Sequence, residues 1–155
     1  MRKLNQEIND PNIIEEILKT ATICRIAMVD NGKPYIIPLN YGFNDGFIYI
    51  HSAPEGKKIE ILKENNQVCF EIESTAATIK HEIPCKWSEK YRSIIGYGTV
   101  EFIHDSELKK EALEIIMKQH GATGTQNFEK KQVEFVVILK VKINQLSAKQ
   151  SSNWR

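Results

Sequence analysis

The sequence has 155 residues, of which 41% are hydrophobic and 26% are charged, so we expect one globular domain with a substantial core. Its 21 basic and 20 acidic side chains give a net charge of +1 without a basic stripe, which argues against a nucleic-acid-binding protein. No apolar run has the length of a membrane span and the polar start is unlike a signal peptide, so a cytoplasmic protein is expected. Three cysteines without a CxxC pair favour reduced thiols over disulfides or a metal site.

The first element is a short helix. Asp10 followed by Pro11 is typical of a helix start, because aspartate caps the first N–H groups and proline is tolerated in the first turn. The following residues repeat at helical spacing, so one apolar face is expected, made of Ile13, Ile14, Ile17 and Leu18.

A β-hairpin is predicted next. Strands are expected over residues 21–29 and 34–43, joined by a tight turn at Asn31 and Gly32, which readily adopt positive φ. Pro38 lies in the second strand and has no N–H to donate to a ladder. It therefore indicates a sheet edge, a bulge or a ligand-facing position.

The stretch from Phe47 to Asn65 predicts a strand over residues 47–50, a turn and a short helix. Ser52 and Glu55 have the spacing of a capping box, with Pro54 in the first turn. The buried side of the helix is expected to hold Ile59 and Leu62.

Two lysines, Lys57 and Lys58, follow Gly56 in the opening turns of this helix. A helix N-terminus presents N–H groups and partial positive charge, so the three residues make a plausible phosphate cradle. A capped surface helix with two solvated lysines fits the same residues.

The second half is expected to contain these elements in order: a strand over 67–73, an irregular segment over 74–90 anchored by Trp87, a strand over 91–103, a helix over 107–120 capped by Ser106, a polar loop over 121–131, a strand over 133–143 and a frayed tail from Ser147. Gly96 and Gly98 interrupt the strand 91–103 and suggest a bulge or a close backbone approach. About six strands with few helices predict a mostly β (α+β) fold, an antiparallel barrel with outer helices, although an open sheet fits the same order.

Two groups of side chains are candidates for chemistry. His51 shares a strand face with Phe47 and Tyr49, where it either faces a ligand or bonds to backbone. Arg92 offers a planar fork for phosphate and Ser93 a hydroxyl, although a plain structural strand explains both. Together with Ser52 and the two lysines, these residues are what an anionic cofactor needs.

Three motifs, KPYIIPLNYGF, FIYIHSAPEGKK and CKWSEKYRSIIGYGTVEF, occur in this order. In this order and spacing, the chain resembles the FMN-binding split barrels related to pyridoxamine 5′-phosphate oxidase, and within them the nitroimidazole-resistance proteins. The resemblance covers residues 1–149, which we take as one FMN-binding domain, and leaves 150–155 as a C-terminal tail.

The resemblance implies a six-stranded split barrel that forms a homodimer with two FMN sites shared between subunits. Carried over by position, the FMN-binding residues would be Pro38, Leu39 and Asn40 beside the isoalloxazine, His51 and Ser52 near the ring and ribityl chain, Lys57 and Lys58 at the phosphate, and Arg92 and Ser93 completing the pocket. His51 matches the histidine that faces the flavin in the nitroimidazole-resistance branch and is the catalytic candidate, as a group that could protonate a reduced acceptor.

The C-terminal end departs from the family pattern. Residues 146–149 only approximate the Ile-Thr-Gly-Lys of the nitroimidazole-resistance branch, and the Trp/Arg substrate elements of true pyridoxamine phosphate oxidases have no match, which argues against vitamin B6 oxidation. The resulting hypothesis is an FMN-dependent oxidoreductase acting on a small, aromatic or nitro-bearing acceptor. The alternative is a non-catalytic flavin- or haem-binding protein that stores, carries or senses its ligand; substrate and electron donor stay open.

Overall fold

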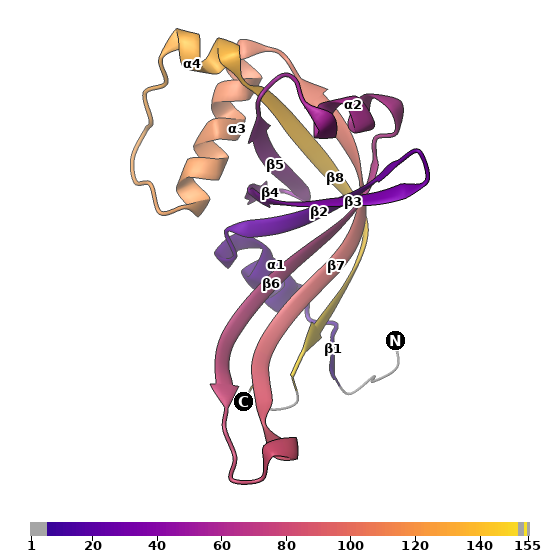
Figure 1. Cartoon of the computed structure of the whole chain (residues 1–155). Coiled ribbons are helices and arrows are strands. Elements are labelled where there is room, and N and C mark those ends of the chain that lie inside the picture. Colours follow the sequence, from indigo (N-terminus) through magenta and orange to yellow (C-terminus); the bar gives the residue numbers. More distant parts are fainter. Residues whose placement is uncertain (1–5, 152–153, 155) are drawn as a thin grey trace.

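The computed structural model describes residues 6–151 and Trp154, with the backbone alone for residues 75 and 76. The predictions for the first five residues and for 152, 153 and 155 lie outside this range. The described chain forms one antiparallel sheet with four α-helices around it (Figure 1). The strands are β1 Glu7–Ile8, β2 Ile23–Asp30, β3 Lys33–Asn40, β4 Gly42–Asn44, β5 Phe47–Ser52, β6 Gln67–Ile79, β7 Ser88–Ile103 and β8 Val137–Gln150.

The sheet curls into a barrel that stays open along one side. The strand order is β3-β2-β6-β7-β8-β5-β4, with β1 added to β8. The edge strand β3 touches β5 across an open seam, but no hydrogen-bonded ladder joins the two in the described part of the chain. The predicted split-barrel class is confirmed, with six long strands and the two short strands β1 and β4 in addition. The edge position of Pro38 in β3 is confirmed as well.

Four helices flank the barrel: α1 Pro11–Thr20, α2 Lys57–Glu64, α3 Ser106–Gln119 and α4 Lys130–Phe135. The predicted cap of α1 is confirmed, since the Asp10 carboxylate accepts from the Asn12 N–H at 2.9 Å. Ile17 and Leu18 then turn into the core, where the Tyr41 hydroxyl donates to the Leu18 carbonyl at 2.8 Å. Of the helices in the described residues, none is long and apolar enough to cross a membrane.

Strand alternation sets the core. Along β5, Ile48, Ile50 and Ser52 are buried, while His51 points outward and is exposed. The predicted β2–β3 turn is confirmed as well, since Asn31 and Gly32 both have positive φ. Alternation places one set of side chains inside the barrel and leaves the other available for helices or ligands.

At the glycine pair in β7 the structure shows both a bulge and a close backbone approach, the two features that the sequence suggests. The β7–β8 register shifts between Tyr97 and Gly98, which is a bulge. A Cβ on Gly96 would lie 2.2 Å from the buried Phe70 ring and 2.9 Å from the Gln145 carbonyl oxygen. A side chain at position 96 would therefore collide with β6 and β8, and only glycine fits there.

The largest correction concerns residues 74–90, which are not irregular. β6 continues to Ile79 and β7 begins at Ser88, so the two strands form an arm that projects beyond the barrel (Figure 1). A short 3-10 turn, Pro84–Lys86, lies at the tip. Apart from residues 75 and 76, whose side chains are not described, no side chain between 74 and 90 is fully buried. A strand without a buried face lacks the apolar alternation that identifies it in sequence.

The predicted helix starts also need correction. α2 begins at Lys57 with Gly56 as N-cap, not at a Ser52 capping box, because the Ser52 hydroxyl donates to the Ala53 carbonyl instead. α3 is capped by Asp105 and not by Ser106, since the Asp105 carboxylate accepts from Glu107 and Leu108.

Two further predictions near the C-terminus were wrong. The short helix α4 occupies the segment expected to be loop and then strand. β8 pairs as far as Gln150, so the tail is not frayed from Ser147.

Candidate functional site

The open seam brings two predicted site segments together. β3 contacts β5, and Gly42, two residues after the end of β3, pairs with Tyr49 in the β4–β5 ladder. The ends of β3 and β5 therefore lie near each other. Asn40 and His51 are both exposed, whereas Leu39 and Ser52 point to the barrel interior. The seam therefore offers an outer rim, with Pro38 and Asn40 on β3 and His51 on β5.

The start of α2 lies a few residues after this rim. Gly56 adopts φ 111°, a conformation that glycine accepts readily, and a Cβ there would meet nothing within 4 Å. Within the described chain no side chain caps the helix, so its first amides have no side-chain acceptor. Lys57 and Lys58 are the first two helical residues, closer to the N-terminus than the predicted capping box would have placed them.

The two lysines differ in their surroundings. The Lys57 ammonium contacts the Asp30 carboxylate at 3.0 Å and lies 4.9 Å from the centre of the Tyr35 ring. Lys58, about 100° away around the helix, is half-buried. Asp30 and Tyr35 were expected only as turn and strand residues, because their contact with Lys57 depends on how α2 packs and carries no local signal.

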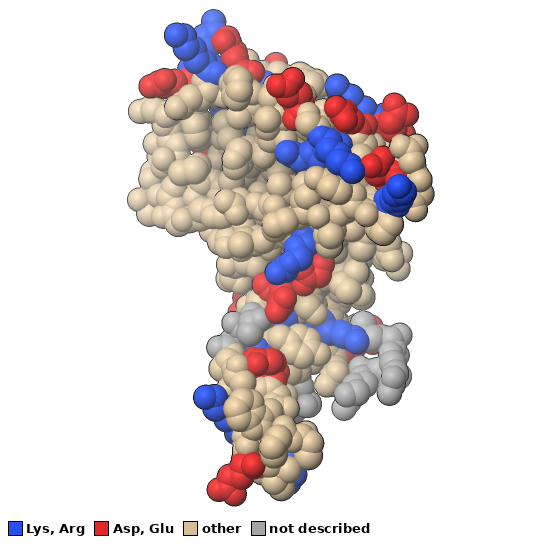
Figure 2. All heavy atoms as spheres, in the orientation of Figure 1, with Lys and Arg blue, Asp and Glu red and all other residues tan. Residues whose placement is uncertain are grey.

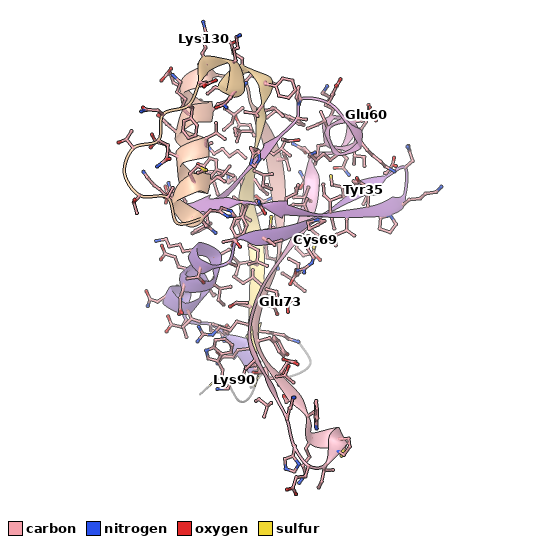
Figure 3. The ribbon with its side chains drawn as sticks, turned by 60° about the vertical axis from the view of Figure 1, so that its left-hand side comes forward. Tyr35, Glu60, Cys69, Glu73, Lys90 and Lys130 are labelled. Atoms are coloured by element: carbon pink, nitrogen blue, oxygen red, sulfur yellow. The ribbon has the colours of Figure 1, made fainter. Side chains whose placement is uncertain are left out.

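A groove of about 600 Å³ runs between α2 and the β2–β3 turn. Its charged lining residues are Asp30, Lys57, Glu60, Lys63 and Glu64. Figure 2 shows acidic and basic side chains mixed over this region, and Figure 3 shows Glu60 and Tyr35 at this end of the barrel. With three carboxylates against two ammonium groups, the groove itself repels a phosphate, so an anion fits only at the uncapped start of α2.

Arg92 and Ser93 lie elsewhere. Arg92 pairs with Ser74 in β6, two residues beyond Ile72, which pairs with Cys24 near the start of β2. Lys57 contacts Asp30, at the other end of the eight-residue strand β2, so the two basic groups are roughly 25 Å apart. Within one chain they cannot hold the same phosphate.

The Arg92 side chain is also engaged inside the chain. Its guanidinium contacts the Glu16 carboxylate at 3.2 Å, donates to the Gln150 side chain at 3.3 Å and lies 4.3 Å from the centre of the Trp154 ring. Only 12% of the Arg92 side chain is exposed. Ser93 is on the opposite, outer face of β7, because neighbouring strand residues alternate.

No alternative catalytic centre emerges from the cysteines and histidines. Among residues 6–151 and Trp154, no three His, Cys, Asp or Glu side chains gather as a metal site. Cys24 is buried, and this burial raises the pKa of its thiol to about 12. A thiol with so high a pKa is unsuited to act as a nucleophile.

The sequence matches the protein family described as pyridoxamine 5′-phosphate oxidase over residues 10–150. It matches no curated protein. Among solved structures, a candidate 5-nitroimidazole antibiotic resistance protein from Bacteroides thetaiotaomicron VPI-5482 is 34% identical, with a TM-score of 0.81, over 93% of this chain and 86% of that chain.

Two more distant structures share the fold. The FAD and heme binding protein from Mycobacterium smegmatis is 20% identical with a TM-score of 0.84, over 96% of this chain and 75% of that chain. The flavocytochrome Anf3 from Azotobacter vinelandii is 18% identical with a TM-score of 0.79, over 96% of this chain and 70% of that chain. The family match spans nearly the whole barrel, so the chain belongs to the pyridoxamine 5′-phosphate oxidase family, as its three motifs predict.

Proposed function

We propose that the protein is an FMN-dependent oxidoreductase that reduces a small aromatic acceptor, with nitroaromatic compounds as the first candidates. The observation that carries this proposal is that the exposed His51, at the end of β5, is followed within a few residues by the start of α2, which no described side chain caps. The 34% identity to the candidate 5-nitroimidazole antibiotic resistance protein supports the choice of acceptor.

The residues at the start of α2 fit an FMN phosphate. Open space around Gly56 lets an anion approach the backbone, and the first-turn amides attract negative charge. Lys58 would add a charge-assisted hydrogen bond, while Lys57 would contribute less because Asp30 already pairs with it. Pro38, Leu39 and Asn40 would border the ring system, with His51 and Ser52 across the seam.

Bound FMN would supply the one- and two-electron chemistry. The protein's own contribution is to bind and orient it, and to offer a proton. The His51 imidazole is exposed, so it is accessible to a reduced acceptor beside the seam and could deliver a proton to it.

A homodimer completes this proposal. The outer face of the sheet carries exposed apolar residues on adjacent strands, where Ile36, Ala27, Cys69 and Tyr97 form one cross-strand row and Ile95 lies in the next. A second copy on this face would cover them. In a site shared between two copies, Arg92 or Ser93 of one copy would act at α2 of the other. The three free thiols fit a reducing compartment, and we propose the cytoplasm.

Three measurements test the proposal. The absorption spectrum of the purified protein should show flavin bands. With NAD(P)H and a nitroaromatic acceptor, the protein should oxidise the nicotinamide faster than the same concentration of free FMN. Light scattering should return twice the chain mass. Turnover that never exceeds that of free FMN, over several acceptors, would exclude the enzyme.

Replacing His51 by alanine gives a sharper test of its role. Because His51 is exposed at a strand end, we expect His51→Ala to leave the melting temperature nearly unchanged and to lower turnover or shift the flavin spectrum. The exposed His104→Ala is the matched control. A large fall in melting temperature with unchanged spectrum and rate would assign His51 a structural role only.

A second candidate is a non-catalytic flavin- or haem-binding protein. It is favoured by the fold shared with the Mycobacterium smegmatis and Azotobacter vinelandii proteins, whose names include heme or flavocytochrome. The exposed His51 imidazole could then serve as a haem ligand. Haem titration separates the two functions: a Soret band that is lost in His51→Ala, without flavin turnover, would favour the haem-binding protein.

A further inference from the structure

The most exposed large apolar side chain that the structure describes is Phe135, at 72% exposure. It is the last residue of α4, a helix that the sequence does not predict. A single exposed phenylalanine is ordinary by itself. What distinguishes Phe135 is its position, on a firmly held helix just before the strand that pairs with β5.

Phe135 lies next to the candidate site. Ser52 pairs with Val137 and His51 with Ile138 in the β5–β8 ladder. Phe135 precedes Val137 by two residues, so its Cα is within about 7 Å of the Val137 Cα and beside the chain that leads from His51 to α2. In Figure 1, α4, the end of β5 and α2 lie at the same end of the barrel, and in Figure 3 Lys130 of α4 and Glu60 of α2 share that end.

The helix that carries Phe135 is firmly attached. Val133 is 1% exposed, and its carbonyl accepts a hydrogen bond from the Lys109 ammonium at 3.2 Å. Lys109 itself is only 6% exposed. Burying a lysine is costly, so this contact indicates a helix whose position matters rather than a mobile loop.

We propose that Phe135 is a specificity-determining residue of the site: its ring forms an apolar wall against which a planar aromatic acceptor stacks beside His51. This inference rests on the proposed function, because it assumes that the acceptor binds at the seam. Stacked aromatic rings attract each other beyond the area that they bury, so the wall favours planar aromatic compounds over small polar oxidants.

The test compares Phe135→Ala and Phe135→Tyr with the wild-type protein, and uses Met117→Ala, an exposed apolar residue on α3, as control. Binding of 2-methyl-5-nitroimidazole to the purified protein is measured by calorimetry, together with KM for this compound and for ferricyanide. Phe135→Ala should weaken nitroimidazole binding and raise its KM by about tenfold, while ferricyanide kinetics and FMN content stay unchanged. Phe135→Tyr and Met117→Ala should behave like the wild type.

Equal nitroimidazole affinity in Phe135→Ala and wild type would overturn the inference, whether or not the protein turns over. A change from dimer to monomer in Phe135→Ala would also overturn it, by assigning the ring to a subunit interface. Failure of the proposed function has a different signature, namely absence of flavin bands and of turnover in the wild type. In that case calorimetry of the nitroimidazole still decides the role of Phe135, and undetectable binding to the wild type counts against it.

Discussion

The two basic groups of the candidate site lie at opposite ends of the barrel and differ in how they are used. At the α2 end, Lys58 is the second residue of a helix that no described side chain caps, and the neighbouring Lys57 pairs with Asp30. At the arm end, Arg92 is 12% exposed and is surrounded by Glu16, Gln150 and Trp154. In the sequence both groups are candidates to bind an anion. Within one chain, only the group at α2 is open to a ligand. The availability of a cation thus depends on its tertiary neighbours more than on its motif.

The two ends are joined through the bend of β7, and Gly96→Ala should disrupt both. The new methyl group would lie 2.2 Å from the Phe70 ring, which is fully buried and cannot move aside. We expect the free energy of unfolding to fall by about 3 kcal/mol. Trp87 and Trp154, the two tryptophans of the chain, report on the arm end in urea titrations, and circular dichroism reports on the whole fold.

The two signals should change at the same urea concentration, because one cooperative body unfolds. Glu101→Ala, at an exposed position of the same strand, is the control and should change the stability by less than about 0.5 kcal/mol. Two separate transitions would show that the ends are independent units.

The start of α2 should bind FMN more tightly than riboflavin. Only FMN carries the phosphate, so Lys58→Ala should weaken FMN binding by roughly ten- to a hundred-fold and leave riboflavin binding nearly unchanged. Lys63→Ala, in the last turn of the same helix, is the control. Fluorescence titration with both ligands measures the effect. An equal loss for both ligands would mean that Lys58 shapes the pocket instead of binding the phosphate.

Substitutions of Arg92, at the arm end, should lower mainly the free energy of unfolding. Arg92→Ala removes the contacts to Glu16, Gln150 and Trp154, so we expect a loss of about 1–3 kcal/mol in urea unfolding. Arg92→Lys keeps the charge but not the planar stack and should recover part of the loss. In the proposed shared site, Arg92→Ala should also reduce the preference for FMN over riboflavin. A stability loss with an unchanged preference would remove Arg92 from the site.

The smallest effect is expected at Asp30. Asp30→Asn removes the carboxylate that pairs with the Lys57 ammonium at 3.0 Å. The Lys57 ammonium is then free to interact with the phosphate. Exposed ion pairs are worth about 0.2–1 kcal/mol, so FMN binding should become roughly two- to five-fold tighter. Raising the salt concentration should shrink this gain. Weaker FMN binding in Asp30→Asn would mean that Asp30 positions Lys57 for the ligand.

Several parts of the fold follow from neighbouring residues alone. The Asp10 cap of α1, the Asn31-Gly32 turn and the alternation of Ile48 and Ile50 are set within a few positions. The arm between residues 74 and 91 was missed because it has no buried face, and the start of α2 was misplaced because the Ser52 hydroxyl bonds to the adjacent Ala53 carbonyl instead of capping the helix.

The sequence by itself determined the family, the strand-rich class and the residue types suited to an anionic cofactor, because motifs, alternation and turn chemistry are local. Only the tertiary structure decided that β3 and β5 meet at the seam, and that Arg92 is held by Glu16, 76 positions away. It also placed Phe135 just before the strand that pairs with His51 and Ser52, on a helix attached by a lysine from α3. Such contacts join segments far apart in the chain, and their partners are chosen by the packing of the whole barrel.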